Sequence, residues 1–378
     1  MGDPRRTAIA VLCVVLGVVT VAGAAHERVE KTLLLDEAIS VQELVQFENL
    51  LGSVTIRGGG EPGQVKVEAR VVAEADTAEQ AQSLADSIRV VRTDDDDGAL
   101  LHVFFPVDDH TAFRMPREVQ DNRIARWVAP LLKKFNKTTV AAVYDGRTVQ
   151  VGQSKGAMAL AVHVSVILPY DVHSSVRQFM GTVDCDRLRG DLEIETVEGH
   201  VELGRVYGKL DARTGAGDLT VLTFRGERAH IQTSSGTVEM VDVDADELSL
   251  RTGSGPIRGR QIKSDALTVN AQSGEVELEE LDTRRFDVTT GSGDVDLETR
   301  LQRTREATIR SGSGDVILRV GTLAPFDLEA RSESGSVKAD GTLDIAQQEK
   351  TAATIHRGTG GAALEVTTTS GAVVLKVQ

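Results

Sequence analysis

Aromatic side chains are scarce in this chain: phenylalanine, tyrosine and tryptophan together make up 3% of its 378 residues. Stacking platforms for sugar rings or nucleobases are therefore scarce as well. Positive charge is also in short supply, because the formal net charge is −15. Nucleic acids and anionic membrane surfaces bind basic patches. The acidic balance argues against both, and we expect no nucleic-acid partner.

The chain has two cysteines, Cys13 and Cys185, which are too few for a disulfide framework. No group of cysteines and histidines has metal-site spacing, and no phosphate-binding loop, nucleophile elbow or zinc signature occurs. We therefore expect no metal, no cofactor and no catalytic residues, and a protein that is not an enzyme. The hydrophobic fraction of 40% is ample for one large core.

The N-terminus combines a basic start, Arg5 and Arg6, with an apolar run that ends in small residues at Ala25. This pattern predicts a secretory signal peptide over residues 1–25. It places the protein outside the cytoplasm, in the periplasm or at the cell surface. The alternative is an uncleaved N-terminal anchor, because the run approaches the length of a short membrane-spanning helix.

A repeat is the strongest pattern in the chain. Glycines recur nine, then nineteen, then twenty-one residues apart. These glycines are Gly181, Gly190, Gly199, Gly208, Gly217, Gly226, Gly236, Gly255, Gly274, Gly293, Gly314 and Gly335. Each is followed by alternating apolar residues, which is typical of a strand with one buried face. Self-similarity at this period predicts a solenoid.

The repeat aligns apolar residues in columns. Two residues after the corner glycine stand Leu219, Val238, Ile257, Val276, Val295, Val316, Val337 and Val373. One strand cannot bury its apolar face alone, so successive coils of about 19 residues stack and share a core. The sequence therefore predicts a mainly β protein, a parallel β-solenoid with regular repeats over residues 173–378. Cys185 falls in an inward column, where a thiol behaves as a small hydrophobe.

The corners of the coils carry two further expectations. Glycine is expected where the backbone needs a positive φ or passes close to its neighbour. Serine precedes the glycine in seven coils, at Ser235, Ser254, Ser273, Ser292, Ser313, Ser334 and Ser370. We expect these hydroxyls to bond backbone groups at the bend, as serine does in turns.

Residues 26–172 are predicted to be N-terminal solenoid coils with helical insertions at 76–88 and 114–137. In the first helix, Asp76 is the expected N-cap and Glu79 completes a capping box. The second segment carries seven basic and two acidic residues. One interpretation is a lid that covers the solenoid end. The other is a basic amphipathic helix that contacts a membrane or a partner.

Asp294 and Asp315 are the candidate catalytic pair. They follow corner glycines in adjacent coils, and paired carboxylates can cleave glycosidic bonds. Aspartate is also an ordinary turn residue, and no third, orienting group accompanies the pair. We therefore assign no catalytic residue.

Several segments together resemble the bacterial putative-adhesin family. They are Asn49–Gly52, the capped helix at 76–88, the turn Leu168–Tyr170 and the coils with a Ser-Gly-Asp-Val motif. The resemblance covers roughly residues 45–378. It implies a right-handed β-solenoid, often exported, whose function is unknown, and it supplies no functional residues.

The leading hypothesis is an exported, non-enzymatic β-solenoid that presents a surface to a protein or cell-envelope component. One alternative is a carbohydrate-active β-helix enzyme, a lyase or hydrolase, that uses Asp294 and Asp315. Another is a self-assembling scaffold similar to the bactofilins.

Overall fold

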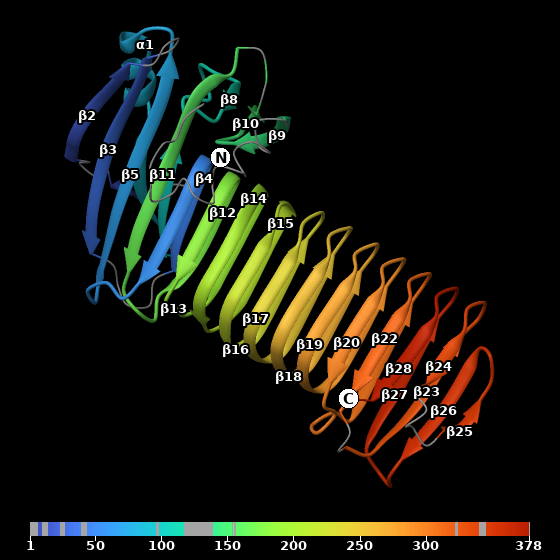
Figure 1. The fold of residues 1–378 in the computed structure, drawn as a ribbon. Helices are drawn as coiled ribbons and strands as arrows, with labels where there is room; N and C mark the ends of the chain where they lie inside the picture. Colours follow the sequence, from blue (N-terminus) through green and yellow to red (C-terminus); the bar gives the residue numbers. More distant parts are fainter. Residues whose placement is uncertain are drawn as a thin grey trace, which may run out of the picture. The chain divides into compact units, whose positions relative to one another are not determined.

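The computed structural model describes residues 7–9, 14–22, 27–38, 44–95, 98–116, 139–152, 154, 156–321, 324–339 and 345–377. Strands dominate these residues, which confirms the mainly β prediction (Figure 1). The chain divides into two compact units, residues 1–202 and 203–378. Each unit is described separately below.

The described residues of the first unit form fourteen strands and one helix. They are β1 (Thr7–Ile9), β2 (Val14–Ala22), β3 (Glu27–Ala38), β4 (Leu44–Gly58), β5 (Gln64–Ala75), α1 (Ala78–Asp86), β6 (Arg89–Asp95), β7 (Gly98–Phe104), β8 (Ala112–Arg114), β9 (Thr139–Tyr144), β10 (Arg147–Gly152), β11 (Met158–Leu168), β12 (His173–Asp186), β13 (Leu188–Arg189) and β14 (Leu192–Tyr207), the last of which continues into the second unit.

The predicted signal segment contains β1 and β2, and β2 pairs antiparallel with β3. Among the described residues, no helix combines the length and apolar character needed to cross a membrane.

Strand β4 forms a coil corner at its midpoint. Its first part pairs in parallel with β7, its second part pairs with β11, and β12 runs alongside both parts. The change occurs at Gly52, where φ is +134°. A Cβ there would lie 2.0 Å from the carbonyl oxygen of Val162. Glycine is therefore required both for the turn and for the close approach of the neighbouring strand.

The first predicted helix is present, but its cap differs from the prediction. The N-cap is Thr77, whose Oγ1 accepts a hydrogen bond from the backbone N–H of Gln80 at 3.2 Å. The expected N-cap, Asp76, lies one residue too early. Both residues can cap a helix, so the sequence alone did not separate them. Residues 117–137 of the second predicted insertion lie outside the described residues.

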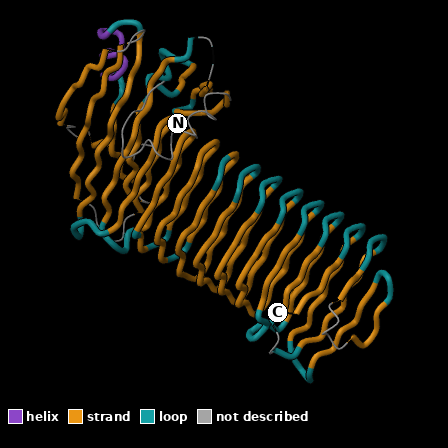
Figure 2. Tube along the Cα trace, viewed as in Figure 1, coloured by secondary structure: helices purple, strands orange, loops and turns teal. Residues whose placement is uncertain are grey.

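The second unit is a stack of parallel strands (Figures 1 and 2). Its strands are β15 (Leu210–Ala216), β16 (Leu219–Thr233), β17 (Val238–Thr252), β18 (Ile257–Ala271), β19 (Val276–Thr290), β20 (Val295–Thr299), β21 (Glu306–Ser311), β22 (Val316–Val320), β23 (Phe326–Ser332), β24 (Val337–Ala339), β25 (Ile345–Gln348), β26 (Ala352–Arg357), β27 (Ala362–Thr368) and β28 (Val373–Val377).

The predicted columns coincide with the observed register. Strands β16 to β19 pair in parallel, and each residue faces the one nineteen positions further along. Leu219, Val238, Ile257 and Val276 are fully buried along this ladder. The apolar faces of successive coils therefore form one shared core, which confirms the β-solenoid prediction.

Close backbone approach explains the corner glycines from Gly236 onward. A Cβ on Gly255 would lie 1.7 Å from the carbonyl oxygen of Gly236, and one on Gly274 would lie 2.0 Å from that of Gly255. Real Cβ atoms do not approach an oxygen so closely, so any other residue would push the coils apart. Among the described corner glycines of the repeat, a positive φ is found at earlier positions, such as Gly208 and Gly217.

The hydroxyls that secure the bends come three residues before the glycine, not one. The Oγ1 of Thr290 accepts a hydrogen bond from the N–H of Gly293 at 3.0 Å and donates one to the carbonyl of Gly274 at 3.4 Å. Ser311, Ser332 and Thr368 make equivalent pairs of bonds. Among the seven predicted serines, a hydroxyl bond to the backbone is found at Ser334, with Thr369.

Burial explains why the bonded hydroxyls lie three residues before the glycine. The hydroxyl-bearing residue three positions before the glycine points inward and is buried, at 2% exposure for Thr290. A buried hydroxyl must find partners, whereas exposed serines such as Ser254 and Ser292 can bond water.

The C-terminal coils do not stack in sequence order. Strand β28 pairs in parallel with both β22 and β24, and β27 pairs with both β21 and β23. The last coil of the chain is thus inserted between two earlier ones (Figure 1). The expectation that successive coils are neighbours is correct from β15 to β22 and wrong beyond that point. Strand β26 then pairs antiparallel with the outer side of β23, and β25 with β26.

We predict that Leu278→Ala lowers the free energy of unfolding by about 2–5 kcal/mol, because it leaves a cavity in the shared core. Leu278 is fully buried. Its exposed neighbour Glu279 provides the control, and Glu279→Ala should change stability by less than about 0.5 kcal/mol. Urea unfolding followed by circular dichroism measures both. Equal losses would contradict the assignment of Leu278 to the core.

Thr290→Val tests the hydroxyl ladder, because valine keeps the shape but leaves the N–H of Gly293 without its hydroxyl acceptor. We expect a loss of roughly 1–3 kcal/mol in unfolding free energy. The adjacent outward residue, as Thr289→Val, is the matched control. Its hydroxyl donates to Oδ1 of Asp287, which water can reach and bond in its place, so the loss should be smaller than for Thr290→Val. If the two variants unfold at the same urea concentration, the ladder does not contribute to stability.

Candidate functional site

One outward position of the repeat can be followed from coil to coil. We call the residues four positions before the corner glycines the outer column. In the order of the stacked coils they are Arg213, Gln232, Arg251, Asn270, Thr289, Arg310, Thr367 and Arg331. Side chains alternate along a strand, so these residues point away from the core that their sequence neighbours fill.

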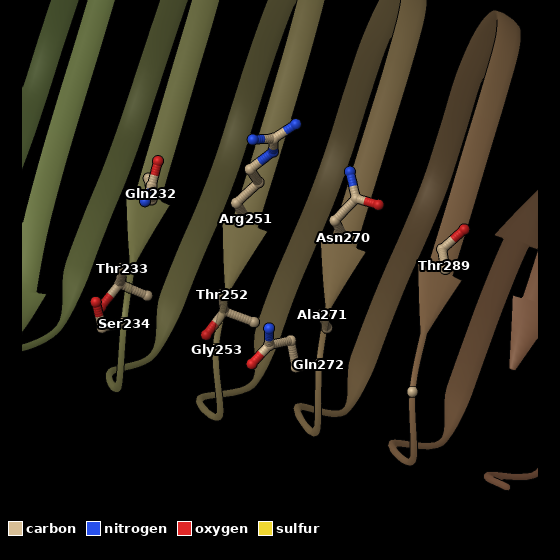
Figure 3. Close-up of a pocket in the computed structure, with 11 residues that line it drawn as sticks. Gln232, Thr233, Ser234, Arg251, Thr252, Gly253, Asn270, Ala271, Gln272 and Thr289 are labelled. Carbon is tan, nitrogen blue, oxygen red and sulfur yellow. The ribbon is translucent and has the colours of Figure 1, made fainter. Parts of the chain in front are cut away.

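A groove of about 630 Å³ lies over four neighbouring members of this column (Figure 3). We call it the Arg251 groove. Its lining residues are Gln232, Thr233, Ser234, Arg251, Thr252, Gly253, Asn270, Ala271, Gln272, Thr289 and Gly291. The lining therefore consists of one guanidinium, carboxamides, hydroxyls and small residues, and it includes no carboxylate and no aromatic ring. A second groove continues along the column over Thr289, Arg310 and Arg331.

Arg251 differs from the other arginines of the outer column. Each of the other arginines forms an ion pair with a carboxylate. The pairs are Arg213–Asp211 at 2.6 Å, Arg310–Asp287 and Arg310–Glu365 at 3.4 Å each, and Arg331–Glu329 at 3.3 Å. Within the part of the chain that the structure describes, the Arg251 guanidinium has no hydrogen bond and no ion pair. It is exposed between Gln232 and Asn270.

The neighbouring outward column explains this difference. The paired arginines have carboxylates at the position two residues earlier in their own coil or in an adjacent one. At that position the three coils around Arg251 carry His230, Ser249 and Thr268, which face each other in register. Among the described residues of these three coils, neither outward column carries an acid group, and the Arg251 guanidinium has no partner. The carboxylate of Asp287, on the next coil, accepts a hydrogen bond from the hydroxyl of Thr289 at 3.2 Å.

The candidate catalytic aspartates have structural roles. Asp294 and Asp315 do lie in neighbouring coils, as predicted. The Oδ1 of Asp294 accepts a hydrogen bond from the N–H of Asp315 at 2.8 Å, and the Oδ1 of Asp315 accepts one from the N–H of Ala372 at 2.7 Å. Asp218 accepts in the same way from Thr237. These carboxylates join one coil to the next at the corner.

The sequence also predicts a buried Cys185 and no metal site. Cys185 is fully buried, as predicted, and burial raises the pKa of its thiol far above the ordinary value. Among the described residues, no three histidine, cysteine or acidic side chains lie close enough together to hold a metal ion.

The first unit contains a charged cluster that the sequence analysis missed. His102 on β7 is 7% exposed, and its Nδ1 lies 3.0 Å from Oε2 of Glu48 on β4. Its Nε2 lies 2.9 Å from Oδ1 of Asp145. Asp145 occupies the two-residue Asp-Gly turn between β9 and β10, with φ of 50°, as hairpin turns require. The cluster therefore attaches this hairpin to the sheet.

The cluster changes the ionisation of its members. Burial lowers the pKa of His102, but the Glu48 hydrogen bond and the charges of Asp145 and Glu48 outweigh burial, so the pKa lies above its ordinary value of 6.5. The hydrogen bond from His102 holds the pKa of Glu48 below its ordinary value of 4.5. Beside them, Tyr144 donates a hydrogen bond to the carbonyl of Val103, and burial raises its pKa. The cluster is thus an ion pair inside an aromatic pocket.

The model of the family described as Toastrack DUF4097 matches residues 136–376, well over half of the chain. The chain belongs to this family. The match confirms the resemblance noted in the sequence. As a toastrack protein it belongs to a family whose function is not known, and no curated protein matches it.

Solved structures similar to this toastrack protein are distant in sequence. A putative adhesin from Bacteroides fragilis is 8% identical, with 92% of this chain and 97% of that chain covered and a TM-score of 0.34. A putative lipid binding protein from Parabacteroides distasonis is 10% identical, with the same coverage and a TM-score of 0.39. A putative cell adhesion protein from Clostridium sporogenes is 8% identical, covers 91% and 99%, and has a TM-score of 0.16.

The His102 cluster makes stability depend on pH in a defined direction. The pKa of His102 is raised on folding, so its contribution is full below about pH 6.5 and is lost as pH rises through the folded-state pKa. The pKa of Glu48 is lowered, so its contribution is full above pH 4.5 and is lost as pH falls through the folded-state pKa. The ion pair is therefore complete between these values.

We predict that His102→Gln lowers the free energy of unfolding by roughly 1.5–3 kcal/mol near pH 6. The loss should shrink as the pH rises through the raised pKa of His102, because the wild-type imidazole then gives up its charge. Urea unfolding at several pH values measures the difference. His356→Gln is the control, because His356 pairs with Asp327 on the exposed surface; its effect should stay below about 1 kcal/mol. A loss that does not vary with pH would contradict the ion pair.

Proposed function

We propose that this toastrack protein is an exported, non-enzymatic binding protein that attaches to a protein or other cell-envelope component through the Arg251 groove. The observation that carries the proposal is the unpaired Arg251 in an acid-free part of a strongly acidic surface. A solvent-exposed guanidinium gains little for the fold itself, whereas it can donate several hydrogen bonds to a ligand.

Three further features support this function. The basic start and apolar run over residues 1–25 favour export. Solenoids use regular coil surfaces of this kind for binding, and the Arg251 groove occupies four successive coils of the outer column. The carboxylates of Asp294 and Asp315 are bonded to backbone amides of neighbouring coils, which accounts for them without a reaction.

Cell fractionation tests export and binding together. We expect the full chain in the envelope fraction, held there by the groove. Arg251→Gln should move about tenfold more protein into the soluble extracytoplasmic fraction, because it removes the guanidinium of the described groove lining. Arg331→Gln is the control in the same column, since Arg331 is already paired with Glu329. Recovery of the wild-type chain from the cytoplasm would contradict export, and equal release of all three proteins would contradict binding through the groove.

A further inference from the structure

We infer that the Arg251 groove binds a glycan that carries isolated, singly charged acid groups, carboxylates or phosphodiesters, between neutral hydroxyl-bearing sugars. This inference rests on the proposed function and names the chemistry of its ligand. It follows from the charge, the hydrogen-bonding groups and the backbone of the groove.

The charge of the groove selects one acid group at a time. The planar guanidinium of Arg251 can pair with a carboxylate or a phosphate oxygen pair through two parallel hydrogen bonds. On either side along the column stand the neutral amides of Gln232 and Asn270. A continuous polyanion would place its next charges beside these neutral groups, on a protein whose net charge is −15. Isolated acid groups avoid that repulsion.

The groups around Arg251 suit hydroxyls. The groove is lined by amides and a hydroxyl that both donate and accept hydrogen bonds, at Gln232, Asn270, Gln272 and Ser234. The hydroxyl of Thr289 donates to Oδ1 of Asp287 at 3.2 Å and can still accept a hydrogen bond from a ligand. Neighbouring coils place equivalent groups about 4.8 Å apart, the spacing of strands in a sheet. A linear chain of hydroxylated rings that lies along the coils would meet such a group at each step.

The backbone of the groove is closed to a peptide strand. The corner N–H groups of Ser234, Gly253 and Gln272 donate to carbonyls of the preceding coil at 3.2 Å each. Strand addition needs free backbone groups and pockets for alternate side chains. In the described groove these corner N–H groups are already bonded, and the lining contains no large apolar residue that would form a side-chain pocket. Recognition must therefore come from side chains that read a polar, hydroxyl-rich ligand.

Isothermal titration of the full chain with defined oligosaccharides tests this inference. One probe is a tetrasaccharide with a single uronic acid between neutral sugars, and a second carries one phosphodiester in place of the uronic acid. The matched control is the first probe with its carboxyl reduced to an alcohol. We expect at least one acidic probe to bind, and the reduced probe to bind about 10- to 100-fold more weakly. The probe that binds identifies the acid group.

Variants separate the groove from the rest of the surface. Arg251→Gln should weaken binding of the acidic probe about 10- to 100-fold, and Asn270→Ala by less, whereas Arg331→Gln should leave it unchanged. Circular dichroism and unfolding confirm that each variant is folded. A polyuronate that binds more tightly per carboxylate, or an acidic peptide that competes equally, would overturn the inference.

The outcomes also distinguish this inference from the proposed function. If Arg251→Gln releases the protein from the envelope but no oligosaccharide binds, the ligand is not such a glycan and the proposed function stands. If neither effect is seen, both fail.

Discussion

Contact between backbones at the glycine corners is the constraint on which the second unit depends. A Cβ at these corners would lie 1.7–2.0 Å from the carbonyl oxygen of the neighbouring coil at Gly255, Gly274, Gly293 and Gly314. Glycine therefore sets how closely coils stack, and the fixed repeat length brings equivalent residues into register. The buried columns, the hydroxyl ladder and the outer column all follow from this register. In the Arg251 groove the backbone is as regular as elsewhere, but the arginine lacks the carboxylate partner that the other arginines of the outer column have.

Much of the fold could be predicted because one-sided burial leaves a period in the sequence. Leu219 and its equivalents were identified as core residues from spacing alone. The order of the C-terminal coils could not be predicted in this way. Gly371 lies against Gly314, 57 residues earlier, and Gly335 lies against Gly371. Every coil presents the same apolar columns to its neighbours, so the pattern fits several stacking orders equally well.

The candidate site was harder to predict because it depends on what its neighbours lack. Alternation along the strand places Arg251 on the outer surface. It has no ion-pair partner because the nearby outward positions, in three different coils, hold His230, Ser249 and Thr268 and not carboxylates. Conversely, the conspicuous Asp294 and Asp315 proved to be bonded to corner amides. The His102 cluster brings together residues from β4, β7 and the β9–β10 turn, and their distance in sequence left no local pattern to find.

The inserted C-terminal coil has a consequence for biosynthesis. The chain is made from its N-terminus, so β22 and β24 exist before the strand that separates them. Both keep open hydrogen-bonding edges until residues 362–377 have been synthesised, and such edges readily pair with other chains. A polypeptide that lacks residues 362–377 would therefore retain unpaired strand edges at β22 and β24. Residues 362–377 thus close the edges of two coils at once.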